Sequence, residues 1–305
     1  MRLRHLLLII LLVCFWGFNW VVIKVGLNGV PPLTLCFARF FLASLPAVFV
    51  IPKPKIPIKT IAAYGLIMFA LQFSLLFLGM HMGVAVGLAS LLSQQGQVFF
   101  TVSLVALFCG ERPNKWQVTG ILISFIGVII IAINLHATAS ISGALLVIIS
   151  SIAWGIGNLI SKKLPKINML ALVIWSSLFA WPPMLLLAIF GEGTTGFVNS
   201  LVHVQWLSLA AILYLAYIAT LLGFWAWNFL LNRYPAATVT PFTLLIPIIA
   251  FLSAGLFLGE QIKSWEVLAG FIIIAGLCIN IVSPKLSKIR LAIENVFANF
   301  AFRKF

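Results

Sequence analysis

Two stretches of this chain, 149 residues apart, carry nearly the same sequence. One is FFTVSLVALFCGERPNKW, which contains Glu111, and the other is IAFLSAGLFLGEQIKSW, which contains Glu260. Nearer the start of each half the spacing is 138 residues, as between Trp16 and Trp154. The second copy therefore holds 11 extra residues, which we place in the polar connection at 191–200. Because both copies consist of long apolar runs, the repeat predicts a duplicated membrane protein, an arrangement typical of transporters.

Composition places the chain in a lipid bilayer. Its 305 residues are 63% hydrophobic and 8% charged, whereas soluble domains carry about 25% charged residues. At about 20 residues for each crossing, we predict an all-α membrane protein with ten transmembrane helices. Their ranges are 5–27, 33–51, 59–81, 85–109, 114–134, 140–162, 169–190, 205–231, 236–258 and 264–283.

The positions of Lys and Arg predict the orientation of these spans, because cytoplasmic loops are enriched in both residues. With the N-terminus inside, 16 of the 19 basic residues lie on the cytoplasmic side, and Lys24 and Lys263 lie outside. Both termini are therefore expected to be cytoplasmic. Five spans per half is an odd number, so residues 1–136 and 137–284 should form an inverted repeat. Residues 285–305 form a basic amphipathic tail that we expect on the membrane surface.

Several motifs resemble the EamA-type branch of the drug/metabolite transporter superfamily. They are WGFNWVVIKVGL at 16–27, PPLTLCFARF at 31–40, GLASLLSQQGQVFFT at 87–101, GER at 110–112 and YLAYIATLLGF at 214–224. The second copy departs from the pattern, since Gln261 replaces the Arg of the GER element. The resemblance implies a ten-helix, multi-pass exporter in the bacterial inner membrane. It also implies that the solutes are small amino acids or their metabolites, of the cysteine and O-acetylserine class.

A polar stripe follows one face of the fourth predicted span. Ser90, Gln94, Gln97 and Thr101 are spaced four, three and four residues apart, which stacks them on one side of a helix. Such a stripe suits hydrogen bonding to an uncharged or zwitterionic solute. The alternative is a purely structural role, because Gln and Ser also hydrogen-bond between membrane helices.

Amides and aromatic rings in other spans are candidates for the same site. Asn19, Gln72 and Asn158 lie near the middle of the first, third and sixth spans. Small-molecule pockets are built from aromatic walls with a few convergent polar groups. Accordingly, we add the aromatic candidates Trp16, Trp154 and Tyr217. For each of these residues, helix packing remains the alternative role.

Two cations lie toward the expected outer side. Lys24 ends the first span, and Arg39 lies about two turns into the second. We expect Arg39 to attract the carboxylate of a solute, whereas a long basic side chain can also reach the membrane interface without any such role.

The acidic residues favour structural roles and a simple mode of transport. Glu111 and Glu260 each precede a predicted helix, where a carboxylate can cap free N–H groups. The chain contains no Asp, and its five Glu residues fall in loops, helix ends or the tail. Because buried acids usually carry proton or sodium coupling, we predict a facilitator, or coupling through a proton carried by the solute. Pro241 and Pro247 predict a kink in the ninth span.

Other classes of function fit the sequence less well. Efflux of larger amphipathic or aromatic compounds is the alternative within transport. A membrane-embedded enzyme would need a nucleophile, a metal cluster or paired acids, and the four His and four Cys residues lack the spacing of a metal site. We therefore predict no catalytic residues, no metal and no cofactor. The expected partners are a small-molecule solute and membrane lipid, without nucleic acid, and the chain is expected to be a monomer or a homodimer.

Overall fold

All regular elements are helices in the residues that the computed structural model describes, which are 1–82, 84, 86–134, 140–258, 264–265, 267–280 and 282. The first half contains α1 (Leu3–Leu27), α2 (Pro32–Val48), α3 (Ile58–Tyr64), η1 (Gly65–Leu71), α4 (Gln72–His81), α5 (Val86–Cys109) and α6 (Lys115–Asn134). The second contains α7 (Ile141–Lys163), α8 (Met169–Glu192), α9 (Thr194–Val202), α10 (Trp206–Leu213), η2 (Tyr214–Leu222), α11 (Gly223–Arg233), α12 (Ala236–Val239), η3 (Thr240–Leu245), α13 (Ile246–Leu258) and the final helix Val267–Asn280.

The predicted spans coincide with these helical runs to within a few residues. Seven runs in the described chain are long and apolar enough to cross a bilayer. They are Leu3–Leu27, Ile58–Met80, Leu92–Cys109, Ile141–Lys163, Met169–Glu192, Trp206–Arg233 and Ala236–Phe257. Two shorter apolar helices, Pro32–Val48 and Val267–Asn280, accompany them. This number of apolar helices is typical of a multi-pass membrane protein.

Local sequence signals explain where several helices begin. Pro32 occupies the first turn of α2, where a missing N–H group costs nothing. The side chains of Ser140 and Asn168 cap α7 and α8 by accepting hydrogen bonds from backbone N–H groups one turn ahead. Asn114 and Gln117 exchange backbone and side-chain hydrogen bonds at the start of α6, each 2.9 Å long. The starts of α6, α7 and α8 are thus capped by residues that lie next to them in the sequence.

Three of the described runs depart from regular α-helical geometry. The segments η1 and η2 are π-helical, and their first residues, Gly65 and Tyr214, are 149 residues apart, as are the two Glu motifs. The 3₁₀ segment η3 contains Pro241 and ends two residues before Pro247 of α13, so the ninth span is irregular where the kink is predicted. The connection at 191–200, where we place the 11 extra residues of the second half, contains most of the short helix α9 rather than an irregular loop.

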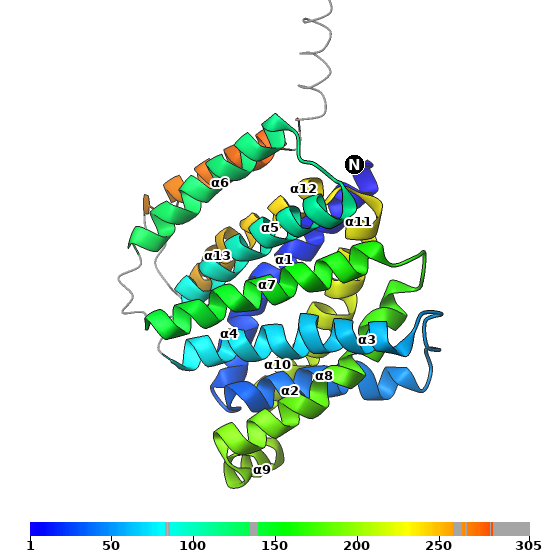
Figure 1. Cartoon of the computed structure of the whole chain (residues 1–305). Helices are drawn as coiled ribbons and strands as arrows, with labels where there is room; N and C mark the ends of the chain where they lie inside the picture. Colours follow the sequence, from blue (N-terminus) through cyan, green and yellow to red (C-terminus); the bar gives the residue numbers. More distant parts are fainter. Residues whose placement is uncertain are drawn as a thin grey trace, which may run out of the picture.

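Helices of the two halves pack against each other throughout the core. α2 lies against α8, α5 and α4 lie against α7, and α1 lies against α13 (Figure 1). The main hydrophobic cluster draws on both halves, with Ile9, Phe40 and Phe69 from the first and Leu172 and Trp227 from the second, all almost fully buried. The core therefore lies where the two copies meet.

α6 and the helix Val267–Asn280 form a separate pair at one side of the molecule (Figure 1). Gly120 packs against the carbonyl of Gly276, and Gly127 packs against the carbonyl of Ala269. Between these contacts, Ser124 Oγ donates a 3.2 Å hydrogen bond to Ile273 O. Small residues let two membrane helices approach closely. The two glycine contacts are equivalent in the repeat, because Gly120 and Ala269 are 149 residues apart, as are Gly127 and Gly276.

One predicted role of a carboxylate needs correction. Glu111 does cap a helix, but that helix is α12 of the second half, where Ala236 N donates to Glu111 Oε2 at 3.0 Å. The start of α6, which follows Glu111 in sequence, is capped by Asn114 instead. The reason is tertiary, because the loop after α5 packs onto the α11–α12 connection. Glu260, Glu266 and the tail 285–305 lie outside the described residues.

Candidate functional site

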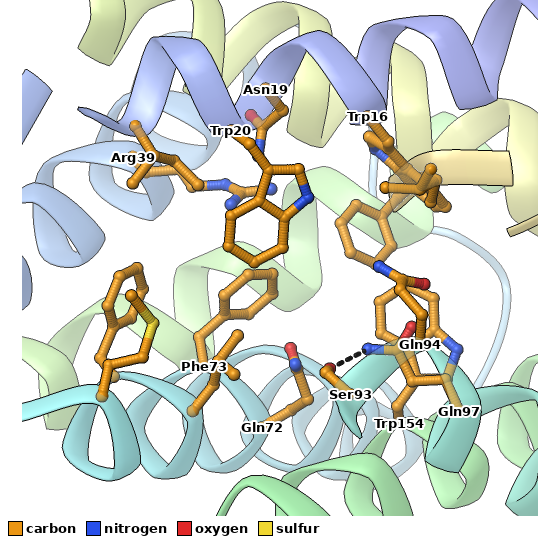
Figure 2. Close-up of a pocket in the computed structure, with 16 residues that line it drawn as sticks. Trp16, Asn19, Trp20, Arg39, Gln72, Phe73, Ser93, Gln94, Gln97 and Trp154 are labelled. Carbon is orange, nitrogen blue, oxygen red and sulfur yellow. Dashed lines mark hydrogen bonds between the residues drawn. The ribbon is translucent and has the colours of Figure 1, made fainter. Parts of the chain in front are cut away.

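A cavity lies between the two halves, in the middle of the helices. Its walls come from α1, α2, α4 and α5 of the first half and from α7, α11 and α13 of the second (Figure 2). The cavity has a volume of about 70 Å³, whereas one water needs about 10–15 Å³. The lining residues are Trp16, Asn19, Trp20, Ile23, Arg39, Gln72, Phe73, Leu76, Phe77, Met80, Ser93, Gln94, Gln97, Trp154, Phe224 and Ile246.

Arg39 supplies the positive charge of this cavity. Its side chain is 4% exposed, and its Nε atom donates a 2.6 Å hydrogen bond to Thr220 Oγ1 on η2. The guanidinium carbon lies 4.6 Å from the ring centre of Phe73 and 5.3 Å from that of Phe40. In the part of the chain that the structure describes, no carboxylate forms an ion pair with Arg39. A buried cation is thus held by aromatic rings and one hydroxyl group.

Amide side chains face the cavity from three helices. Asn19 of α1, Gln72 of α4 and Gln94 of α5 each have a buried carbonyl oxygen without a hydrogen-bond partner among the described residues. Gln97 Nε2 donates to Ser93 Oγ at 2.8 Å, and Figure 2 shows this bond on the wall formed by α5. An unpaired buried acceptor costs about 1–3 kcal/mol. These oxygens are therefore available to a solute that carries hydrogen-bond donors.

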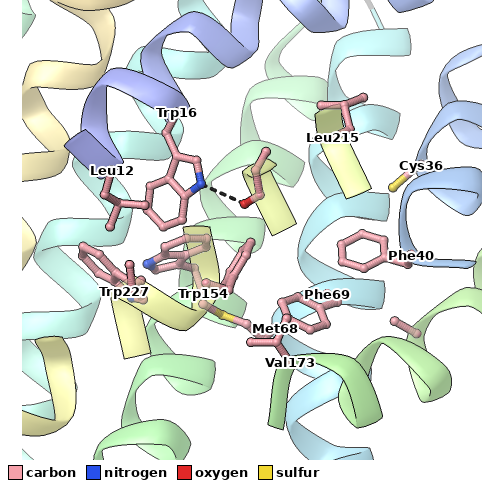
Figure 3. Close-up of a cluster of buried hydrophobic side chains, with 14 of the residues drawn as sticks. Leu12, Trp16, Cys36, Phe40, Met68, Phe69, Trp154, Val173, Leu215 and Trp227 are labelled. Atoms are coloured by element: carbon pink, nitrogen blue, oxygen red, sulfur yellow. Dashed lines mark hydrogen bonds between the residues drawn. The ribbon is translucent and has the colours of Figure 1, made fainter. Parts of the chain in front are cut away.

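Aromatic rings close one side of the cavity. Trp16 contacts Trp154, Phe224 and Trp227, with ring centres 5.4 to 5.8 Å apart. Trp16 Nε1 donates to the carbonyl of Ala219 at 3.0 Å, which fixes the orientation of the indole (Figure 3). Because the rings come from α1, α7 and α11, this cluster joins the two halves beside the cavity.

A hydrogen-bonded network lies beyond the aromatic cluster. Asn158 Nδ2 donates to Thr101 Oγ1, and Trp227 Nε1 donates to Asn158 Oδ1, both at 2.8 Å. Nearby, Asn228 accepts a 2.6 Å hydrogen bond from Ser161 and exchanges hydrogen bonds with Tyr64. Asn158 and Asn228 are fully buried. The network therefore links α3, α5, α7 and α11 through side chains that have partners within the protein.

An ion pair lies at the end of α7, next to this network. Lys162 Nζ lies 2.8 Å from Glu111 Oε1 and donates to the carbonyls of Leu231 and Tyr234 at 2.8 and 2.6 Å. The side chains are 10% and 28% exposed for Lys162 and Glu111. With the Glu111 cap on Ala236, the pair ties the loop after α5 and the end of α7 to the α11–α12 connection.

The structure brings most of the sequence-predicted residues together. Those that line the cavity are Trp16, Asn19, Arg39, Gln72, Gln94, Gln97 and Trp154. Ser90, Asn158 and Tyr217 are not among the lining residues. Asn158 is engaged by Thr101 and Trp227, and the side chain of Tyr217 is 37% exposed on the outer face of η2. Ser90 is buried one turn before Ser93, and Thr101 is turned toward α7.

Sequence reasoning missed several lining residues. Ser93 lies four residues before Gln97, and this spacing alone could have revealed the pair. Trp20 lies one turn after Trp16 on α1, so helical spacing could also have found it. Phe73 follows Gln72 directly, and no periodic signal separates it from the other apolar residues of its span. Within the described residues, no group of three or more His, Cys, Asp or Glu side chains could hold a metal ion.

Comparison with known protein families shows to which family the chain belongs. The profile of the EamA-like transporter family matches residues 3–133 and again residues 141–282. The chain belongs to the EamA-like transporter family. It is a multi-pass membrane protein, and transport rather than catalysis is the activity of this family. The two matched stretches leave out the region of the tail.

Similar proteins are found in several bacteria. A probable amino-acid metabolite efflux pump of Salmonella typhimurium is 38% identical over 280 residues, which cover 90% of this chain and 93% of the relative. The protein of the same description in Escherichia coli is 36% identical over 281 residues, with the same coverage. An uncharacterized inner membrane transporter of Escherichia coli, YedA, is 27% identical over 90% of this chain.

A solved crystal structure supports the fold. It superposes with a TM-score of 0.69 at 14% sequence identity, over 92% of this chain and 98% of the other. Identity at this level bears on the fold alone.

Proposed function

We propose that the chain is a secondary transporter of the bacterial inner membrane that exports small amino acids or their metabolites, of the cysteine and O-acetylserine class. The observation that carries this proposal is the cavity, which combines Arg39 with three unpaired amide oxygens between the two halves. The relatives described as amino-acid metabolite efflux pumps, at 36–38% identity, support the same class of solute. The small volume of the cavity favours such solutes over larger amphipathic compounds.

The mechanism we propose is alternating access by an inverted repeat of five plus five spans. Pairs of counterparts support it, namely the two π-helical segments and the two glycine contacts between α6 and the last helix. In such repeats, one half rocks against the other around a fixed central site. The cavity fits that description because both halves contribute to its walls.

The expected orientation also gives the cavity a side. With cytoplasmic termini, α1 and α4 run outward, and Trp20, Ile23 and Met80 lie toward their outer ends. The Glu111–Lys162 pair then lies on the cytoplasmic side, together with the network around Asn228. We infer that this conformation is closed to the cytoplasm and that export requires the ion pair to open.

Transport in this proposal needs no buried acid. Glu111 and Glu192 are the described acidic residues, and both stabilise helix starts or a lysine near the ends of the spans. We therefore expect the solute gradient to drive release.

Efflux from inside-loaded vesicles tests the function. Release of radiolabelled cysteine and O-acetylserine is measured for the intact chain, for Gln94→Ala and for Gln205→Ala. Gln205 is the control, because it is an exposed glutamine outside the cavity. We expect Gln94→Ala to slow release about three- to tenfold, since one hydrogen bond is lost, and Gln205→Ala to behave as the intact chain. A proton gradient should not alter the rate. Absence of release for both solutes would rule out the proposed substrate class, and normal release by Gln94→Ala would remove Gln94 from the site.

A further inference from the structure

We propose that the cavity recognises its solute as a zwitterion: Arg39 binds the carboxylate, the amide oxygens of Gln72 and Gln94 bind the ammonium group, and Thr220 positions Arg39. This inference rests on the proposed function, because it assigns the charged groups of the exported solute to named residues. It goes further in requiring both charges on one molecule.

Arg39 has the properties of a carboxylate-binding residue. A guanidinium group stays protonated in proteins and carries five N–H donors. The bond to Thr220 uses the Nε donor, and Phe73 and Phe40 lie against the guanidinium group. The two terminal nitrogens have no hydrogen bond within the described residues. A buried charge is costly without a partner, and a carboxylate would pair with such nitrogens in the two-bond geometry that arginine favours.

The ammonium side is made of neutral acceptors. Gln72 is 1% exposed, and its Oε1 atom, like that of Gln94, is buried without a partner among the described residues. In Figure 2, Arg39 reaches toward the Trp20 ring from one side, and Gln72 and Gln94 lie on the opposite side of the cavity. A primary ammonium group offers three N–H donors and no acceptor. It would supply the missing donor to both oxygens without competing for Arg39.

The two π-helical segments orient both sides of this arrangement. Gln72 is the first residue after η1, and Phe73, which lies under the guanidinium group, follows it. Thr220 lies within η2, where its Oγ1 donates a 2.8 Å hydrogen bond to the carbonyl of Leu215 five residues earlier. The same oxygen accepts the Arg39 bond, so the wide turn of η2 fixes the lone pairs that hold the arginine. π-helical turns of this kind recur at functional sites.

A solute that carries a single charge fits this cavity less well than a zwitterion. A cation without a carboxylate would add a second positive charge beside Arg39, where the low dielectric strengthens the repulsion. An anion without an ammonium group would satisfy Arg39 and leave Gln72 and Gln94 unpaired. A zwitterion satisfies both sets of groups.

Competition binding tests this inference. The purified chain binds radiolabelled L-cysteine, and unlabelled L-cysteine, cysteamine and 3-mercaptopropionate compete; cysteamine lacks the carboxylate and 3-mercaptopropionate lacks the ammonium group. For the unaltered chain, we expect each analogue to bind about ten- to a hundredfold more weakly than cysteine, the effect of one lost charge-assisted contact. Arg39→Gln should weaken cysteine by a similar factor and strengthen cysteamine, because the repulsion between two positive charges is lost. Gln72→Met should weaken cysteine and cysteamine and spare 3-mercaptopropionate.

Further variants separate binding from folding. Arg39→Lys keeps the buried charge and loses the two-bond geometry, so cysteine affinity should fall less than in Arg39→Gln. Thr220→Val removes the hydroxyl at constant shape and should weaken both carboxylate-bearing ligands while leaving cysteamine unchanged. Arg233→Gln removes a matched arginine that lies over Phe229, outside the cavity, and should change nothing.

The outcomes distinguish the two proposals. Equal binding of cysteine and cysteamine by the unaltered chain would overturn the zwitterion requirement and leave the exporter in place. Equal losses for cysteine and cysteamine in Arg39→Gln and Arg39→Lys would overturn the assignment of Arg39. Failure of the unaltered chain to bind cysteine would overturn the proposed function and this inference together.

Discussion

Breaking the ion pair between Glu111 and Lys162 should reveal a measurable coupling between the two residues. Glu111→Gln removes the charge but keeps an oxygen that can still accept from Ala236 N. Lys162 retains its bonds to the carbonyls of Leu231 and Tyr234. Lys162→Met removes all three contacts of the ammonium group. The double variant completes a cycle in which only the pairwise term remains.

The structure sets the size of this coupling. The charged atoms are 2.8 Å apart, and the side chains are 10% and 28% exposed. Exposed pairs contribute about 0–1 kcal/mol, and hydrogen bonds to charged groups about 1.5–3 kcal/mol. We therefore expect a coupling of about 1–2 kcal/mol. Glu111→Gln should cost about the same amount, and Lys162→Met should cost about 2–4 kcal/mol because two helix-end carbonyls also lose their donor.

Unfolding in mixed detergent micelles, followed by tryptophan fluorescence, measures these free energies. Lys166→Met is the control, because Lys166 is an exposed lysine near the same helix end and its loss should change the unfolding free energy by less than about 0.5 kcal/mol. A coupling below about 0.3 kcal/mol, the level at which independent sites add, would refute the reasoning. The two helix connections would then be held only by the bonds of Glu111 and Lys162 to backbone groups.

Three further changes test the packing. Gly65→Ala places a methyl group 2.9 Å from the carbonyl carbon of Ser176 and closer still to its oxygen, so η1 and α8 must separate; thermal unfolding should show a loss of about 1–3 kcal/mol. Gly196→Ala is its control, since nothing lies within 4 Å of the added group and helix propensity should raise stability slightly; an equal loss for both would contradict the close approach. Asn158→Leu leaves Thr101 and the Trp227 indole without their partner and should cost about 2–5 kcal/mol in chemical unfolding; an unchanged midpoint would mean that water replaces the amide. Glu192→Ala removes the acceptor for Thr34 N and Oγ1 at the start of α2 and should cost about 0.5–2 kcal/mol, with faster hydrogen exchange confined to that turn.

Much of the helical layout could be predicted from the sequence. Apolar runs of about 20 residues have few ways to satisfy backbone polar groups in a bilayer other than a helix, so the predicted ranges coincide with the observed helical runs. Irregular helical geometry around Pro241 was also predictable, because proline removes a backbone hydrogen bond wherever it occurs. The π-helical segments were not, since η1 and η2 contain no residue that forces a wide turn.

The candidate site was predictable in part, because polar residues are rare in membrane helices. A buried Gln or Arg in a membrane helix is conspicuous, and Arg39, Gln72 and Gln94 all line the cavity. Polar residues alone do not say which face meets the cavity and which meets another helix. Asn158 is chemically similar to Asn19, but its amide bonds to Thr101 and Trp227, whereas the Asn19 oxygen has no partner among the described residues.

The sequence by itself determined that this is a duplicated helical membrane protein with a small set of costly polar groups inside its apolar runs. These properties follow from composition and spacing, which act along the chain. Only the tertiary structure decided that Glu111 caps α12 and that Thr220 holds Arg39. Such pairings join residues more than 100 positions apart, and they depend on how helices from the two halves rotate and pack against each other, which no local pattern encodes.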